Sequence, residues 1–461
     1  MQNTTTKFIT LGCRVNQYET QGMREALEQA GLSRQSKPEA VMQAPEEVGL
    51  VVINSCTVTQ EADRETRYWI RRSKRDYPQA KIVVTGCGVQ RDKSKIAAMD
   101  EVDVALGNDE KNRIADYLAQ SCSDPDIQSG SFKASNTKQD KWTYSSLPIT
   151  HSAGHTRAFI KIQDGCNHAC SFCKVVLVRG RSRSRSAAEI LDEVKRLRDA
   201  GYRDIVLTGI QLGAYGLDFG SSKNELPELM HAIAKISGIE RIRLSSIEPT
   251  DVHHALIEAI QSIPQCAPHL HIPLQSGSNE ILQKMNRRYD RSFYRALISK
   301  LRESIPDWML TLDVMSGFPG EDEQHHQDTL QFIREVKPLK CHVFPYSKRE
   351  GTKASMFQSE ISGSVTKNRV RELLELSDAM GMESMTAYQG QTRSVLVEGV
   401  KTRTSLSDMP NHPIVALQGL TDNFIRVEFQ GDSAWVGQTR KVRLLEVQPQ
   451  IMKAVSEEKE T

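Results

Sequence analysis

Three cysteines stand close together in the segment DGCNHACSFC, at positions 166, 170 and 173. A structural zinc site normally needs four ligands in a closed tetrahedron. No fourth cysteine lies nearby, although His168 is a conceivable substitute. Three thiolates with one open coordination position suit a metal centre that must also bind another molecule. We therefore expect Cys166, Cys170 and Cys173 to hold such a centre.

Three further cysteines each end an apolar, β-branched run. Cys13 follows FITLG, Cys56 follows LVVINS and Cys87 follows KIVVTG, and helical stretches are predicted at 16–30 and 61–76. Strands that alternate with helices predict a parallel α/β sheet, in which ligands bind beyond the carboxyl ends of the strands. The three thiols should therefore converge, despite their separation in sequence, on a second three-thiolate site.

The composition indicates where these sites work. The chain has 461 residues, nine cysteines and a formal net charge of +2. No run is long enough to span a membrane, and the N-terminus lacks the pattern of a secretory signal. We therefore expect a cytoplasmic protein, a monomer, whose thiols stay reduced and available to metals. Two basic runs, RRSKR at 71–75 and RGRSRSR at 179–185, could contact phosphates.

A second series of strands and helices begins at residue 157. Six apolar runs have strand length: FIKIQ, DIVLTG, RIRLSS, HLHIPLQS, MLTLDVMS and CHVFPY. Helical segments separate them, and six β/α units predict a partial barrel related to the eight-unit form. The site should lie on the loops at the carboxyl ends of the strands, and the CxxxCxxC loop follows the first strand.

Composition shifts divide the chain. We expect an N-terminal parallel α/β domain at 1–120, a polar linker at 121–156 and a partial (β/α)6 barrel at 157–385. A helix at about 364–388 precedes a small all-β barrel at 386–448. A tail follows at 449–461, of which MKAVSEEKET at 452–461 is expected to be disordered. The fold class is thus α/β with a β module at the end.

The cysteine loop, with Phe172 before its last cysteine, resembles the signature of the radical S-adenosylmethionine (SAM) enzymes. The resemblance implies that three thiolates hold a 4Fe–4S cluster and that SAM occupies the open position. Reductive cleavage of SAM would then supply a 5′-deoxyadenosyl radical. The open coordination position is explained, because the missing ligand is the substrate.

Further motifs narrow the resemblance to the methylthiotransferases. These motifs are LGCRVNQYE, NSCTVTQEAD, TGCGVQ, RGRSRSR, LTGIQLGAYG, RLSSIEP, HIPLQSGS and GFPGE. The resemblance implies that Cys13, Cys56 and Cys87 hold a second 4Fe–4S cluster, so that the protein binds two clusters. It also implies that SAM contacts Phe172 and five residues at three strand ends: Gly209, Gln211, Ser246, Glu248 and Gln275. The C-terminal strands resemble the TRAM domain, an RNA-binding β-barrel.

Among the branches of that family, the motifs look most like the one acting on threonylcarbamoyladenosine at tRNA position 37. The sequence lacks the Cys-Ser-Ile-Arg-Glu of the isopentenyladenosine branch, and Arg14 stands where the branch acting on a ribosomal protein Asp has Pro. The expected partners are tRNA, a flavodoxin- or ferredoxin-like electron donor and a sulfur donor. Arg181, Arg183 and Arg185 are predicted to bind the tRNA, through phosphates or through the threonine carboxylate.

Two alternatives stay open. One is a methylthiotransferase acting on a protein side chain, and the other is a non-catalytic iron–sulfur protein that binds RNA. The sequence also departs from the family near the expected SAM pocket. KVVLVRG, with Lys174, replaces an Ile-Ile-Pro-Tyr-like stretch, and Met315 and Ser316 replace Ile-Val.

Overall fold

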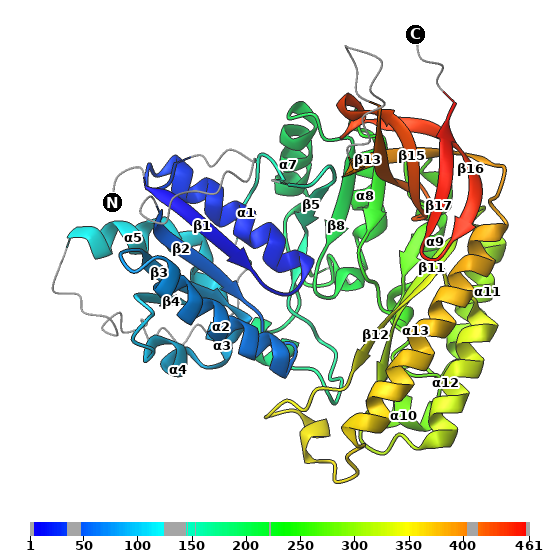
Figure 1. Ribbon diagram of the computed structural model, residues 1–461, viewed down its shortest axis with the longest axis horizontal. Helices are drawn as coiled ribbons and strands as arrows, with labels where there is room; N and C mark the ends of the chain where they lie inside the picture. Colours follow the sequence, from blue (N-terminus) through cyan, green and yellow to red (C-terminus); the bar gives the residue numbers. More distant parts are fainter. Residues whose placement is uncertain are drawn as a thin grey trace.

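The computed structural model describes residues 4–34, 48–123, 144, 146–152, 154–220, 223–402 and 414–457. It contains an N-terminal α/β domain, a central set of β/α units and a C-terminal closed barrel (Figure 1). Most of the predicted linker, 121–156, lies outside the described residues, as does the side chain of Cys122. None of the described helices is long and apolar enough to cross a membrane.

The N-terminal domain is a parallel sheet in the order β1-β2-β3-β4. Its strands are β1 (Thr5–Thr10), β2 (Val48–Ser55), β3 (Lys81–Gly86) and β4 (Val104–Leu106). Helices cover both faces: α1 (Arg14–Gln29), α2 (Gln60–Asp76), α3 (Cys87–Arg91), α4 (Lys93–Ala97), η2 (Asn108–Arg113) and α5 (Ile114–Ser123). Burial on both faces explains why β2 and β3 read as continuous apolar runs.

The central domain contains all six predicted strands, each parallel to its neighbour. They are β5 (Ala158–Lys161), β8 (Asp204–Thr208), β9 (Arg241–Leu244), β10 (His269–His271), β11 (Met309–Ser316) and β12 (Lys340–Pro345). They form two three-stranded sheets, β5-β8-β9 and β10-β11-β12. Single parallel bridges, Ile242 with Cys266 and Ser246 with His271, join the sheets into one open, curved wall.

Helices α7 to α13 enclose this wall. They are α7 (Ala187–Asp199), α8 (Leu226–Ala234), α9 (His254–Ser262), α10 (Asn279–Lys284), α11 (Arg291–Ser304), α12 (Glu323–Val336) and α13 (Gly363–Thr386). A short hairpin, β6 (Gln163–Asp164) and β7 (Arg183–Ser184), and the five-residue α6 (Val175–Arg179) frame the cysteine loop. The predicted helix at 364–388 is α13, and the prediction of an incomplete barrel is confirmed.

The C-terminal module is a closed five-stranded barrel, in the order β13-β14-β15-β17-β16. The strands are β13 (Thr392–Thr402), β14 (Ile414–Thr421), β15 (Arg426–Asp432), β16 (Thr439–Gln448) and β17 (Ile451–Ser456). The prediction of a tail outside the barrel from residue 449, disordered from residue 452, is wrong over β17. Met452 is fully buried in the barrel core, and β17 pairs antiparallel with β16 through a turn in which Gln450 has φ 63°.

Candidate active site at the junction of the domains

The three N-terminal cysteines lie at the carboxyl edge of the parallel sheet, as predicted. Gly12 and Gly86 precede two of them with φ of +90° and +100°, which favours glycine. A Cβ atom on Gly12 would lie 2.6 Å from the Sγ atom of Cys56. Gly12 therefore allows the loops after β1 and β2 to approach closely, and Gly86, where a Cβ would overlap the Ser55 carbonyl oxygen, does the same for the ends of β2 and β3.

One cavity joins the two cysteine sets. It has a volume of about 520 Å³, and its lining includes Cys13, Cys56 and Cys87 from the N-terminal domain and Cys173 from the cysteine loop. A second hollow, of about 590 Å³, is lined by all three cysteines of the loop. Cys173 therefore borders both spaces, and the two predicted sites face a common cavity.

The three cysteines of each set, which we call a triad, have surroundings that fit an iron–sulfur cluster. Peptide N–H groups donate to three sulfurs: Val58 to Cys56 at 3.4 Å, His168 to Cys166 at 3.3 Å and Val175 to Cys173 at 3.4 Å. Such bonds to sulfur are typical of iron–sulfur sites and tune their potential. In the described part of the chain, no three His, Cys, Asp or Glu side chains are placed to hold a single metal ion. That finding is compatible with a cluster, in which each thiolate binds a different iron.

Burial suppresses ionisation of the thiols. It raises the pKa of Cys56 and of Cys166 to about 11, and that of Cys173 to about 12. It also raises the pKa of Cys170, against which the neighbouring Arg287 acts. Because the metal ligand is the thiolate, cluster binding must displace these protons.

The residues expected to contact SAM divide into two groups. Gly209 and Ser246 line the large cavity together with Phe172. Gln211 and Glu248 instead lie beside the cysteine loop. The Gln211 amide donates to the ring of His168 at 2.8 Å, and Glu248 pairs with Arg287, whose guanidinium donates to the Cys170 sulfur at 3.1 Å.

This contact decides the alternative in which His168 is a fourth ligand. Its Nε2 atom faces the Gln211 amide, so the structure opposes that reading.

Gln275 has φ 67°, and its buried side-chain oxygen has no hydrogen-bond partner among the described residues. Gln275 is not among the described residues that line the two cavities. Lys174 and Met315, where the sequence departs from the family, both line the large cavity.

The structure corrects two of the three arginines predicted to bind tRNA. The Arg185 side chain is 1 % exposed and pairs with Glu193 at 2.7 Å. Arg183 is buried and pairs with Asp164 at 3.2 Å. Neither can reach a phosphate, because each is already held by carboxylates inside the protein. Arg181 is exposed, so its role stays a prediction.

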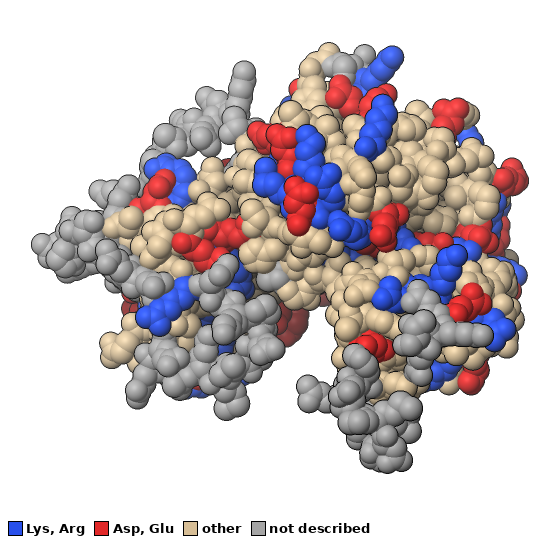
Figure 2. All heavy atoms as spheres, turned by 90° about the horizontal axis from the view of Figure 1, so that it is seen from above, with Lys and Arg blue, Asp and Glu red and all other residues tan. Residues whose placement is uncertain are grey.

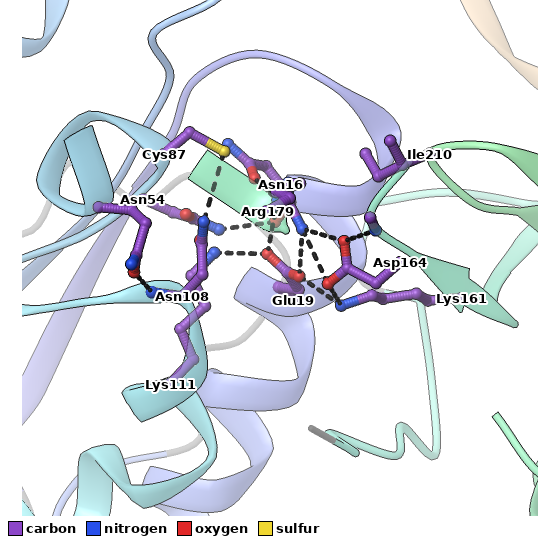
Figure 3. A network of polar contacts seen from close by, with 12 residues as sticks. Asn16, Glu19, Asn54, Cys87, Asn108, Lys111, Lys161, Asp164, Arg179 and Ile210 are labelled. Carbon is purple, nitrogen blue, oxygen red and sulfur yellow. Dashed lines mark hydrogen bonds and ion pairs between the residues drawn. The ribbon is translucent and has the colours of Figure 1, made fainter. Parts of the chain in front are cut away.

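Arg179, the first residue of the basic run at 179–185, is buried and does not contact phosphate; it is the centre of a buried ionic network (Figure 3). Its guanidinium donates to Glu19 at 3.0 Å, Asp164 at 3.0 Å and the Asn16 side chain at 2.7 Å. Burial alone would raise the pKa of Glu19, but the cationic Arg179, Lys111 and Lys161 hold that pKa well below its usual range.

This network joins the two domains next to the N-terminal cysteines. Glu19 and Lys111 belong to the N-terminal domain, whereas Asp164 and Arg179 belong to the central one. Asn108 extends the contact, because its amide donates to the Cys87 sulfur at 3.7 Å and to the Val178 carbonyl at 2.9 Å (Figure 3). Removing one partner of such a buried ion pair strongly destabilises a protein, because the other charge stays buried without compensation. The network therefore fixes the relative position of the two cysteine sets.

The C-terminal barrel also reaches the cavity. Phe424, in the turn between β14 and β15, lines it and stacks on His269 with 3.9 Å between ring centroids and 6° between planes. Arg243 of β9 donates to the carbonyls of Thr421 at 2.8 Å and Asp422 at 3.2 Å. The barrel is thus packed against the central domain and supplies part of the cavity wall.

Comparison with known proteins agrees with this architecture. Residues 160–333 match the Radical SAM superfamily, and residues 5–107 match the uncharacterized protein family UPF0004. A solved radical S-adenosylmethionine methyltransferase, TsrM from Kitasatospora setae, superposes with a TM-score of 0.52 at 14% identity, covering 77% of each chain. At that identity the likeness concerns the fold alone.

Relatives of known activity align over nearly the whole chain. The threonylcarbamoyladenosine tRNA methylthiotransferase MtaB of Bacillus subtilis is 36% identical, covering 96% of this chain and 94% of its own. MtaB of Thermotoga maritima is 33% identical, with coverage of 95% and 94%. The tRNA-2-methylthio-N(6)-dimethylallyladenosine synthase of Carboxydothermus hydrogenoformans is 31% identical, with coverage of 95% and 96%. The chain therefore belongs to the radical SAM methylthiotransferases, enzymes that use a 4Fe–4S cluster and SAM.

Proposed function

We propose that this protein is a tRNA methylthiotransferase that adds a methylthio group to carbon 2 of N6-threonylcarbamoyladenosine at tRNA position 37. The observation that carries the proposal is the shared cavity, which Cys13, Cys56 and Cys87 line together with Cys173. The two triads would each hold a 4Fe–4S cluster. When bound, the clusters supply the electron for SAM cleavage and the sulfur for transfer, and SAM supplies the radical and the methyl group.

The cavity suits a base taken out of its stack. Carbon 2 lies on the edge of adenine and cannot be approached while the base is stacked in the anticodon loop, so the enzyme must splay it out. Phe344, Tyr346 and Phe424 line the cavity and can stack on such a base. A volume of about 520 Å³ falls within the usual range of small-molecule sites.

Arg14 supports the choice of the threonine-bearing base. It lines the cavity, and it forms no ion pair with any of the residues that the structure describes. Burial lowers its pKa, and so do two other arginines, Arg157 and Arg243. A confined cation whose charged neighbours are also cations favours an anionic ligand. The carboxylate of the threonyl group supplies that charge, whereas an isopentenyl group would not.

Lys174 is a second cation on the cavity wall without an ion pair among the described residues. Its electrostatic surroundings differ from those of Arg14, because the carboxylates of Glu350 and Asp63 interact with it as well as the cationic Arg91 and Arg349. We therefore assign the substrate carboxylate to Arg14. A charge-assisted hydrogen bond contributes about 1.5–3 kcal/mol, which corresponds to roughly ten- to a hundredfold in preference.

The assignment is tested with the reconstituted enzyme on one tRNA prepared with and without the threonylcarbamoyl group. Mass spectrometry of nucleosides should find the methylthio group on the modified tRNA and little of it on the unmodified one. Arg14→Gln should narrow the preference at least tenfold, whereas Lys174→Gln should leave the ratio of the two rates nearly unchanged. Equal turnover of both tRNAs by the native enzyme would refute the substrate assignment.

Two other outcomes separate the alternatives. Methylthiolation of a protein Asp, with none of tRNA, would move the enzyme to the protein-modifying branch, because that substrate also carries a carboxylate. A reduced protein that binds tRNA but never forms 5′-deoxyadenosine would be a non-catalytic iron–sulfur protein. Loss of the methylthio nucleoside from the tRNA of cells lacking the gene would support the proposal in vivo.

A further inference from the structure

One face of α2 carries a row of arginines. Arg64, Arg67, Arg71 and Arg75 recur at intervals of three and four residues, so they lie along one side of the helix. Tyr68 and Arg72 interleave with them, and these six residues line a surface hollow of about 380 Å³. All six side chains are exposed. We call this surface the arginine ridge.

The ridge is unfavourable for the isolated helix. Like charges at spacings of four residues destabilise a helix by about 0.2–0.5 kcal/mol per pair. Nearby carboxylates offset part of the charge. Arg64 pairs with Glu61 at 3.3 Å, Arg72 with Asp76 at 3.1 Å, Arg75 with Asp76 at 3.6 Å and Arg71 with Glu101 at 3.9 Å. Arg67 forms no ion pair with any described residue. Folding does not require this arrangement, because α2 is anchored through its other face, where Thr66, Ile70 and Ser73 are buried.

The ridge begins at the rim of the active cavity. Val58 and Thr59, just before α2, line that cavity. The first residue of the helix, Gln60, is fixed to the loop after β12, because its N–H donates to the Ser347 hydroxyl at 2.9 Å and its amide to the Lys348 carbonyl at 3.0 Å. A hollow lined by Gln60, Arg64, Arg67 and Arg349, among others, continues the cavity rim into the ridge. Figure 1 shows α2 at the lower edge of the N-terminal sheet.

We propose that the arginine ridge binds the phosphate backbone of the tRNA whose position-37 base enters the cavity. This proposal rests on the proposed function. From Arg64 to Arg75 the helix rises about 16 Å, enough to follow several consecutive phosphates. Guanidinium groups match phosphate in a forked geometry that lysine does not offer. Tyr68, which is 50 % exposed within the row, presents an aromatic surface for a flanking base.

Its position favours RNA over an acidic protein partner. A nucleotide that enters the cavity leaves its neighbouring phosphates at the rim, where the ridge starts. The face seen in Figure 2 is not sorted by charge in this way. On the described part of the face in Figure 2, Lys and Arg mix with Asp and Glu.

The test reverses two charges on the ridge and compares them with a matched pair elsewhere. Arg67→Glu/Arg71→Glu changes two exposed arginines four residues apart on α2. Lys367→Glu/Arg371→Glu makes the same change in net charge at the same spacing on α13, where both side chains are exposed. None of the described cavity-lining residues comes from α13. Arg67→Gln/Arg71→Gln serves as the milder variant should reversal disturb folding, with thermal melting as the check.

We expect the ridge reversal to weaken binding of the modified tRNA about tenfold or more and to flatten its salt dependence. Removing two phosphate contacts should make the slope of log affinity against log salt shallower by about 1.4 on single-stranded RNA, or about 1.8 on a duplex. KM for tRNA should rise while kcat at saturating tRNA stays near the native value. The glutamine pair should lose less affinity than the glutamate pair, and the α13 control should change little.

Equal losses from the ridge and control variants would overturn the proposal, since they would show only an effect of net charge. Unchanged tRNA affinity with slower cluster reduction by an acidic flavodoxin would also overturn it and assign the ridge to the electron donor. In both cases the native enzyme still modifies tRNA, so the proposed function stands. Failure of the native enzyme to bind tRNA would overturn both.

Discussion

Cys87 and Cys173 line the same cavity, although one follows the third strand of the N-terminal sheet and the other ends the cysteine loop of the central domain. In a sulfur-transfer reaction that a radical starts, the group that generates the radical and the group that supplies the sulfur must both reach one substrate atom. The buried ionic network around Arg179 keeps the two domains in this relation. Arg179 of the central domain pairs with Glu19 of the N-terminal domain and with Asp164 of its own, and Lys111 pairs with the same Glu19.

The two triads should be separable by mutation. After anaerobic reconstitution, six thiolates in two sets should bind about eight irons per chain. Cys166→Ala should bind about half of that iron and lose all 5′-deoxyadenosine formation. Cys56→Ala should also bind about half, yet still cleave SAM without transferring sulfur. Iron analysis and chromatography of the nucleoside products measure both, and methylthiolation by Cys56→Ala would contradict the two-cluster assignment.

Gly12→Ala should damage the N-terminal site more than its backbone strain alone would. Gly12 and Gly31 both have positive φ, +90° and +68°, so alanine is strained at either position. Only at Gly12 does the new Cβ meet the Cys56 sulfur, at 2.6 Å, whereas nothing lies within 4 Å of a Cβ at Gly31. We expect Gly12→Ala to lose about half of the iron and Gly31→Ala to keep it. Equal iron content in the two variants would mean that the loop after β1 can shift without cost.

Much of this arrangement could be predicted from the sequence, because it depends on local patterns. Buried parallel strands appear as apolar runs, and a cysteine directly after such a run must lie at the carboxyl edge of the sheet. The six strands of the central domain were predicted in this way, and so was the convergence of Cys13, Cys56 and Cys87.

The errors concern side chains whose environment is made by distant segments. Arg183 and Arg185 form a basic run in the sequence, but carboxylates from other elements, Asp164 and Glu193, surround them in the fold. Arg14 and Phe424 were not predicted to lie at the cavity, since their position depends on how three domains meet. The last strand was missed because its six residues, IMKAVS, lead into a charged end.

His269 should make the protein sensitive to acid. Burial lowers its pKa well below the usual value, and His271 and Arg243 lower it further. The folded protein therefore holds the neutral ring, while the unfolded chain takes up a proton below pH about 6.5. The stability this histidine contributes is complete above that pH and is lost as pH falls toward the folded pKa. At pH 5.5 the loss is at most about 1.4 kcal/mol, the limit reached when the folded protein takes up no proton there.

His269→Gln keeps a polar group near the Thr311 hydroxyl, to which the ring bonds at 2.9 Å, and removes the titrating group. Urea denaturation at pH 7.5 and 5.5, followed by tryptophan fluorescence, should show a smaller acid-induced loss of stability in the variant, by up to about 1.4 kcal/mol. Identical losses in both proteins would assign the acid sensitivity to another buried group, such as His342, whose pKa burial also lowers.

Phe424 allows a test of whether the C-terminal barrel helps to build the cavity. Its ring lines the cavity and stacks on His269, and its backbone has φ 77°, a conformation that costs a non-glycine residue about 1–2 kcal/mol. Phe424→Ala should destabilise the protein by about 2 kcal/mol, below the range for a fully buried ring, because this side chain is only partly buried. Phe424→Gly loses the same ring but relieves the backbone, so it should be about 1 kcal/mol more stable than the alanine variant.

The two variants should behave alike in catalysis, since both lack the ring. Their KM for tRNA should rise. The formation of 5′-deoxyadenosine without tRNA should continue, because the ring contacts described for Phe424 are with His269 and Arg243 and not with the cysteine loop. Deleting the whole barrel is a less direct test, since Tyr388 and Met309 pack into its core and would become exposed. If tRNA turnover by both variants matched the native enzyme, the barrel would act only as a separate RNA-binding module and the base would not stack on its turn.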